Sequence, residues 1–263
     1  MALTTQQVLA ASDAWLWVPE QARSEVVAGV PVVDYPDWAH TPFWAAPLDT
    51  GRPAEDAPAV VAAVAAVARE RGKPWMTWWL SPSARPVELA DALLAVGAVA
   101  EESCDIVACD LAGGIPDVGD VAPVCTEVVQ DAAGIDDFGA VSDAVWGPVR
   151  DPEARRATQL ADLGRPLAEQ DSRRVVGHLE DRPVAVGGLQ VADGVARLYG
   201  AATRPEARGR GAYRAVLHRR LVEARALGAT TALVHARVGT SGPILRRCGF
   251  EAYGVARSFR LDL

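Results

Sequence analysis

The chain has 263 residues, and 50% of them are hydrophobic, so it can bury the core of one large domain or of two small ones. Its formal net charge is -8 and its isoelectric point lies near 5.1. Affinity for a nucleic-acid backbone requires an extended basic surface, so this charge argues against a nucleic-acid partner.

The residues Met1 to Thr5 carry no Lys or Arg ahead of an apolar run, so the pattern of a secretory signal is missing. A run of ~18 apolar residues, as a membrane span needs, is also missing. We therefore expect a cytoplasmic protein with no membrane partner. The four cysteines, at 104, 109, 125 and 248, form no C-x-x-C pair, and the four histidines are scattered. We interpret the cysteines as buried thiols and expect no metal site.

The first third of the chain is rich in tryptophan and predicts a small α/β unit. Valines at spacings of three and four predict a helix over 58–71, with Asp56 as its cap and Gly72 as its stop. A buried strand over 73–80, a helix over 86–96 closed by Gly97, and a strand over 104–109 follow. The tryptophans could line a ligand groove, but we interpret them as core residues.

Turn-forming residues over 112–120 mark a join, and we place a boundary near residue 115, between domains 1–114 and 115–263. Beyond it the pattern predicts a strand over 124–129 and helices over 131–146 and 152–163. Strands over 173–179, 183–191 and 195–203 are joined by short turns, which predicts an antiparallel meander. A helix ended by Gly228, a strand over 231–236, a short helix over 242–247 and a hairpin over 250–261 complete the expected order.

The stretch from Val195 to Leu217 predicts a strand, a short Arg/Gly loop and a helix. In that arrangement the free amides of the first helical turn point at the loop, and the helix dipole favours an anion there. We predict that the amides of Gly209 to Arg214 bind a phosphate-bearing ligand, because glycine lets the anion approach the main chain. The loop lacks Gly-Lys-Ser/Thr and a three-glycine fingerprint, which argues against nucleotide triphosphatases and dinucleotide enzymes. The alternative is a plain strand-to-helix turn.

Two motifs stand at the proper separation in this order of elements. Arg208, Gly211 and Tyr213 hold the places of an acetyl-CoA loop, in which Arg or Gln precedes Gly by three residues and a further Gly or Ala by five. The stretch from Ile244 to Phe250 matches a short helix that ends in Gly-Phe. In these features residues 120–263 resemble the GCN5-related N-acetyltransferase (GNAT) superfamily. The resemblance implies an α+β fold with a mostly antiparallel central sheet flanked by helices.

The resemblance also implies a function, an N-acetyltransferase that moves an acetyl group from acetyl-CoA to an amine by direct attack in a ternary complex. The acceptor would be a small-molecule or peptide amine. The rival is an acyl-CoA-binding module without turnover, and a homodimer is also considered. The residues that the resemblance implies for the cofactor are Ala201, Ala202 and Thr203 for the pantetheine arm, Arg208, Gly209, Arg210, Gly211, Ala212, Tyr213 and Arg214 for the pyrophosphate, and Ser241 as a hydroxyl contact or a helix cap.

This chain departs from the family pattern at two positions near the expected acid–base chemistry. Leu245 stands where many members carry a tyrosine that acts as general acid, and Val238 stands where an asparagine is usual. Tyr199 and His235 are the candidate catalytic residues that could replace them, although each could instead be a satisfied core residue. Tyr213 fills the last small-residue place of the loop, and we expect its ring to pack inward. The first unit looks like the closing half of a second, degenerate acetyltransferase fold.

Overall fold

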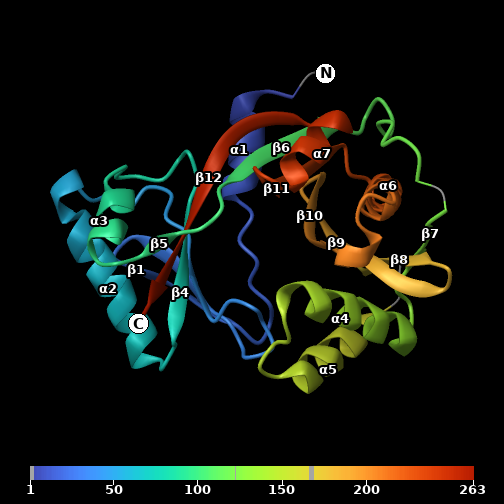
Figure 1. Ribbon diagram of the computed structural model, residues 1–263. Coiled ribbons are helices and arrows are strands. Elements are labelled where there is room, and N and C mark those ends of the chain that lie inside the picture. The colour runs from blue at the N-terminus through green and yellow to red at the C-terminus, as the bar shows by residue number, and fades with distance from the viewer. Residues whose placement is uncertain (1–2, 122, 166–168) are drawn as a thin grey trace. The chain divides into compact units, whose positions relative to one another are not determined.

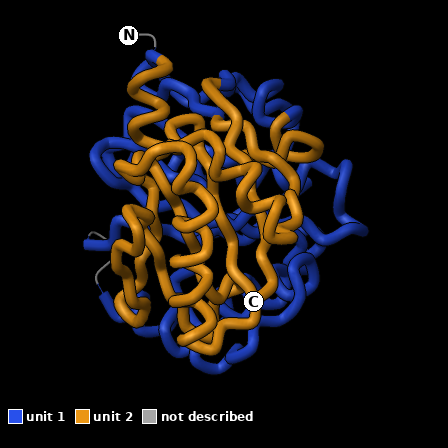
Figure 2. Tube along the Cα trace, turned by 90° about the vertical axis from the view of Figure 1, so that its left-hand side faces the viewer, with its two compact units in different colours: residues 1–4, 107–235, 243–252 blue, residues 5–106, 236–242, 253–263 orange. Residues whose placement is uncertain are grey.

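The structure is a computed structural model that describes residues 3–121, 123–165 and 169–263. It is mixed α+β, with mostly antiparallel strand pairing and helices against the strands, which confirms the expected fold class (Figure 1). The chain forms two compact units (Figure 2). Unit 1 is built mainly of Val107–His235 and Pro243–Ala252, and unit 2 of Thr5–Ile106, Ala236–Gly242 and Tyr253–Leu263. The limits of the units fall inside β6, β11, α7 and β12, whose bounds follow.

Unit 2 contains a short sheet with the strand order β1-β2-β3-β4-β12, and β5 also pairs with β12. Only the β3–β4 pairing is parallel among these ladders. Its elements are α1 (Thr5–Asp13), β1 (Arg23–Val27), β2 (Val30–Asp34), β3 (Phe43–Ala45), η1 (Ala54–Asp56), α2 (Ala57–Glu70), β4 (Trp75–Leu80), α3 (Leu89–Ala95), β5 (Val99–Ala100), β6 (Cys104–Asp110) and β12 (Glu251–Asp262).

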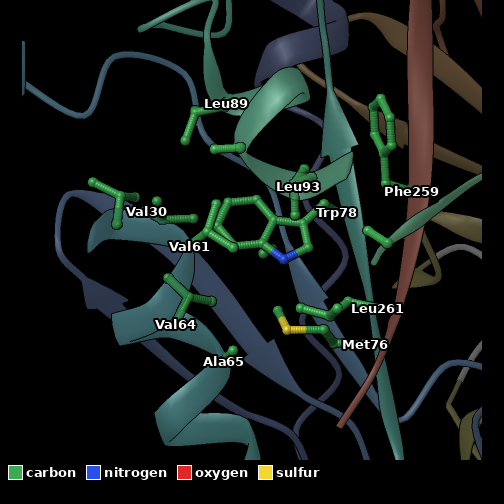
Figure 3. Close-up of a cluster of buried hydrophobic side chains, with 14 of the residues drawn as sticks. Val30, Val61, Val64, Ala65, Met76, Trp78, Leu89, Leu93, Phe259 and Leu261 are labelled. Atoms are coloured by element: carbon green, nitrogen blue, oxygen red, sulfur yellow. The ribbon is translucent and has the colours of Figure 1, made fainter. Parts of the chain in front are cut away.

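The core of unit 2 lies where α2 and α3 cover one face of its strands (Figure 3). Valines of α2 at the predicted spacing, Val61 and Val64 among them, point into it, and Leu93 joins them from α3. Strand β4 alternates, so Met76, Trp78 and Leu80 face this core while Trp75 and Trp79 face the other side. The sequence therefore predicted α2 to within one residue at each end.

The expectation that the tryptophans are core residues is wrong for most of them. Of the seven in the first third of the chain, only Trp78 is fully buried, whereas Trp17 is exposed and the others are half-buried. For the three tryptophans of β4, the period of two explains the difference, because it assigns Trp75 and Trp79 to the face opposite Trp78. On the second face Trp79 stacks on Trp44 with ring centroids 5.7 Å apart.

Three further expectations for these segments need correction. Residues 250–261 form no hairpin but the single strand β12, because Gly254 is a site of close approach and not a turn: a Cβ there would lie 2.9 Å from Pro82. Helix α3 begins at Leu89, three residues later than expected, and Asp56 precedes α2 without a side-chain cap bond. The elements from α1 to β3 were not predicted at all.

Unit 1 contains a sheet with the strand order β11-β10-β9-β8-β7. The meander β8-β9-β10 is antiparallel as predicted, and β10 pairs with β11 in parallel. Its elements are β7 (Cys125–Val128), α4 (Ala132–Trp146), α5 (Pro152–Leu163), β8 (Ser172–Leu179), β9 (Arg182–Ala192), β10 (Val195–Thr203), η3 (Pro205–Ala207), α6 (Ala212–Ala226), β11 (Thr231–Arg237) and α7 (Ser241–Arg247).

Two helices cover opposite faces of this sheet. Val175 and Ala185 pack with Val216 of α6, whereas their neighbours Val176 and Val186 pack with Ile135 of α4. The alternation of each strand thus divides the apolar residues between the two layers. Helix α5 lies beside α4 (Figure 1), and Arg155 of α5 forms a bidentate ion pair with Asp143 of α4.

The cysteines follow the expectation of buried thiols only in part. Cys109 and Cys248 are buried and Cys104 is half-buried, and no disulfide joins them. Cys125 is exposed, contrary to the expectation, because it lies on β7 at the edge of the sheet. Among the described residues, no helix combines the length and the hydropathy that crossing a membrane would require.

Candidate functional site

The strands β10 and β11 of unit 1 run together only at their beginnings. Their parallel pairing joins Val195–Arg197 to Thr231–Leu233, although β10 continues to Thr203 and β11 to Arg237. Past Arg197, this edge of β10 has no ladder partner on β11. The main-chain groups of the last half of β10 on that edge are therefore available to an extended ligand.

A bulge in β10 lies at the same place. The register between β10 and β9 shifts between Tyr199 and Ala202, and Gly200 within the bulge has a φ of +58°. Glycine adopts this left-handed backbone without the Cβ clash that other residues meet. The bulge turns the main chain relative to the first half of β10. Ala201, Ala202 and Thr203, the residues predicted to contact the pantetheine arm, therefore follow a kink in the strand.

The Arg/Gly loop follows directly and leads into α6. Gly209 and Gly211 both have positive φ, +74° and +81°, and Gly211 caps α6 in the left-handed conformation. Helical bonding begins with Ala215, whose N–H donates to the Gly211 carbonyl at 2.9 Å. Among the main-chain hydrogen bonds of the described residues, none is donated by the amides of Gly209 to Arg214. They form the row of free donors that the sequence predicted.

The arginines of this loop take different places. Arg208 and Arg210 are exposed: Nε of Arg208 donates to the Thr203 carbonyl at 3.4 Å, and Arg210 pairs loosely with Glu180 at 3.6 Å. Arg214 is half-buried and reaches the Val118 carbonyl at 3.5 Å. A Cβ at Gly209 would meet no atom within 4 Å, so the loop is open at that residue. Two exposed guanidinium groups beside free amides suit an anion.

Tyr213 turns inward, as expected, and meets a residue that the sequence analysis missed. Arg220 lies about two turns further along α6 on the same face and is 1% exposed, and the charge of Arg220 acts on the Tyr213 hydroxyl. Its Nη1 donates to the Gly188 carbonyl at 3.3 Å, while its Nε has no partner among the described residues. Burial lowers the pKa of Arg220 and raises that of Tyr213. The sequence signal for the buried Arg220 was its position on the apolar face of the predicted helix.

Glycines of β9 leave room for these side chains. A Cβ at Gly187 would lie 2.9 Å from the Arg220 guanidinium, and a Cβ at Gly188 would overlap the Tyr199 ring. The two glycines are neighbours in β9, so they face opposite sides of the sheet. Tyr199 therefore lies on the α4 side and Arg220 on the α6 side, with the bulge of β10 beside both.

Tyr199 and His235 share the α4 side of this sheet. Arg197 pairs with Leu233, and each candidate lies two residues further along its own strand. Tyr199 is 37% exposed, and desolvation of its hydroxyl raises its pKa. His235 is half-buried, and desolvation together with the Arg197 charge lowers its pKa to about 4. At neutral pH the phenol is protonated and the imidazole is neutral.

The remaining predicted residues lie on or before α7. Ser241 is half-buried and is the first residue of α7. Leu245, in the place of the family tyrosine, is fully buried, so this position is filled by packing and offers no hydroxyl. Val238, in the place of the asparagine, is 39% exposed.

A cavity of about 500 Å³ lies in unit 2 and is lined by charged residues. Among them Arg71 pairs with both Glu25 and Asp34. Because these charges satisfy one another, we assign no ligand to this cavity.

Solved structures share the arrangement of parting strands, bulge and following helix only as part of a common fold. The chain has the fold of the GCN5-related N-acetyltransferases. It is similar to a GCN5-related N-acetyltransferase from Kribbella flavida, with a TM-score of 0.70 and 20% identity over 99% of this chain and 96% of that one. A GCN5-related N-acetyltransferase from Sphaerobacter thermophilus superposes with a TM-score of 0.66 and 13% identity, over 89% of this chain and 76% of that one.

A third solved structure bears on the whole length of the chain. A tandem GNAT protein from the clavulanic acid biosynthesis pathway superposes with a TM-score of 0.57 and 15% identity, over 97% of this chain and 87% of that one. No protein-family model matches the sequence, and no curated protein matches it. At these identities the comparisons establish the fold.

Proposed function

We propose that this chain is an N-acetyltransferase of the GCN5-related superfamily that uses acetyl-CoA as donor and an amine as acceptor. The row of free amides from Gly209 to Arg214, directly after a strand that parts from its neighbour, carries the proposal. The fold shared with solved acetyltransferases supports it.

In this proposal, acetyl-CoA is bound by main-chain groups more than by side chains. The amides of Gly209 to Arg214 donate to the pyrophosphate at the positive end of α6, and Arg208 and Arg210 add charge. The free edge of Ala201 to Thr203 pairs with the amides of the pantetheine arm as an added strand would. The small side chains of Ala201 and Ala202 leave that edge uncovered.

The reaction then needs no covalent enzyme intermediate. The acceptor nitrogen attacks the thioester carbonyl, the C–S bond breaks, the nitrogen loses a proton and the thiolate gains one. Tyr199 is our candidate for the acid, because its raised pKa keeps the phenol protonated. His235 stays neutral at pH 7 and can accept a hydrogen bond, but a pKa of about 4 makes it a weak base. We therefore assign it to orienting the acceptor.

Calorimetric titration with acetyl-CoA, run beside a free-thiol release assay over a panel of amines, tests this function. The proposal expects binding, and release of CoA with at least one amine. The rival is an acyl-CoA-binding module without turnover, which is favoured by the buried Leu245 in the place of the tyrosine. Binding without release for every amine would favour the rival, and absence of binding would contradict both.

We also propose that residues 1–114 are a degenerate acetyltransferase half, joined to a catalytic domain over 115–263. The similarity to a tandem GNAT protein over almost the whole chain supports the presence of two acetyltransferase-like parts. The compact units differ from this division, because Ala236–Gly242 and Tyr253–Leu263 belong to unit 2. The first half contains no Arg/Gly loop between a strand and a helix, so only the second half is expected to bind the donor. We also propose that the acceptor is a small-molecule or peptide amine, that the protein is cytoplasmic and that it forms a homodimer.

A further inference from the structure

A cluster of three metal-ligand side chains lies on the α4 face of unit 1, outside the site described above. Glu127 comes from β7, Asp137 from α4 and His178 from β8. One donor atom from each residue lies within 4.8 Å of the others. We propose that these three residues bind a divalent transition-metal ion such as Zn²⁺, which fixes the edge strand β7 to β8 and α4.

The register of the sheet brings the donors together. Glu127 pairs with Val176 and His178 pairs with Cys125, so Glu127 and His178 lie two steps apart on one face of the β7–β8 ladder. That face is the one toward α4, because Val176 packs with Ile135. Asp137, in the second turn of α4, completes the set.

The spacing of the donors suits a small cation. Nε2 of His178 lies 3.2 Å from Oδ2 of Asp137, and the other ring nitrogen, Nδ1, lies 3.7 Å from Oε1 of Glu127. A single ion binds only one of these two nitrogens, so one carboxylate must turn toward the nitrogen that binds the ion. For metal–ligand bonds of about 2.0–2.2 Å, two ligands of a tetrahedral ion are separated by about 3.3–3.6 Å. The His–Asp pair therefore already has nearly the required separation. The Glu127 side chain is 59% exposed and is free to close the remaining gap.

The charges of the cluster are also uncompensated by arginine. Of the three aspartates on α4, Asp136 pairs with Arg156 and Asp143 with Arg155, whereas Asp137 meets only His178 among the described side chains. Arg204 lies close by but donates to the main-chain carbonyls of Pro183 and Ala140. Two carboxylates and one imidazole, the latter neutral when it ligates, leave two negative charges for a divalent ion to balance.

The test is calorimetric titration of the metal-free full chain with Zn²⁺ alone. We expect one equivalent to bind, and His178→Asn and Asp137→Asn each to weaken binding at least tenfold, since even outer partners of a metal contribute ~10–100-fold. His218→Asn removes an exposed histidine of α6 and should leave the affinity unchanged. Thermal unfolding of the metal-free variants shows whether they are folded.

The Cys125→Ser variant controls for Zn²⁺ binding by the exposed Cys125 thiol, which lies opposite His178 in the β7–β8 ladder. Co²⁺ in place of Zn²⁺ adds a second measurement, because its visible absorption reports the ligand set independently of the affinity. A spectrum that changes with His178→Asn supports the site. The proposal is overturned if the wild type binds no Zn²⁺, or if folded His178→Asn binds as tightly as the wild type.

Discussion

Replacing Gly211 by aspartate tests the anion role of the loop against a matched position at the other end of the same helix. Gly211 precedes α6 with a φ of +81°, and Gly228 follows α6 with a φ of +83°. Each substitution forces a side chain into the left-handed region, at about 1–2 kcal/mol of unfolding free energy. At Gly211 the new Cβ would also lie 3.3 Å from the Asp120 carbonyl oxygen, whereas at Gly228 nothing lies within 4 Å.

The two variants should differ in binding far more than in stability. A carboxylate about 5 Å from a phosphate charge, at an effective dielectric constant of ~20, is repelled by about 3 kcal/mol, which raises the Kd for acetyl-CoA on the order of 100-fold. The carboxylate of Gly228→Asp is about 25 Å away along α6 and is screened at physiological salt. Calorimetry measures both Kd values, and thermal unfolding compares the stabilities. Equal Kd values for two folded variants would refute the role assigned to the loop.

Four other substitutions test the acid, the histidine and the core. Tyr199→Phe should lower kcat on the order of 100-fold without changing the Kd for acetyl-CoA, since it removes only the proton donor; an unchanged kcat would show that the phenol is dispensable. The pKa of His235 is about 4 in the folded state and 6.5 in the unfolded state. As the pH falls from 6.5 toward 4, the unfolded state takes up the proton first, so the stability that neutral His235 contributes above pH 6.5 is lost. The advantage of the wild type over His235→Gln in urea unfolding should therefore shrink by about 2–3 kcal/mol between pH 7 and pH 4, and a pH-independent difference would contradict the lowered pKa. Leu93→Ala should lower the unfolding free energy of unit 2 by about 3 kcal/mol, because Leu93 is fully buried. The control Leu94→Ala, at a position 51% exposed, should change this free energy by less than ~0.5 kcal/mol. Similar losses for both variants would contradict the position of the core shown in Figure 3.

Local patterns predicted the elements near the candidate site well. The apolar period of 3.6 located α4 and α6 within a residue or two, and α5 begins and ends at the expected Pro152 and Leu163. Short polar turns predicted the β8-β9-β10 meander, since two or three residues can join only antiparallel strands. The free amides at the start of α6 followed from the helix geometry alone.

Features that depend on tertiary packing were not predictable in this way. The hairpin expected over 250–261 is one case, because a sequence does not say whether a glycine such as Gly254 bends the chain or admits a neighbour. The burial of Arg220 depends on the space that Gly187 leaves on another element. The cluster of Glu127, Asp137 and His178 joins residues up to 51 positions apart, through a ladder register that no short motif records.

A structure of the chain with CoA bound measures the central claim most directly. The account predicts the pyrophosphate oxygens within hydrogen-bond distance of the amides of Gly209 to Arg214, and the pantetheine arm along the free edge of Ala201 to Thr203. The thiol should then lie on the side of the sheet that carries Tyr199. A pyrophosphate bound elsewhere, with these amides left in water, would contradict the account.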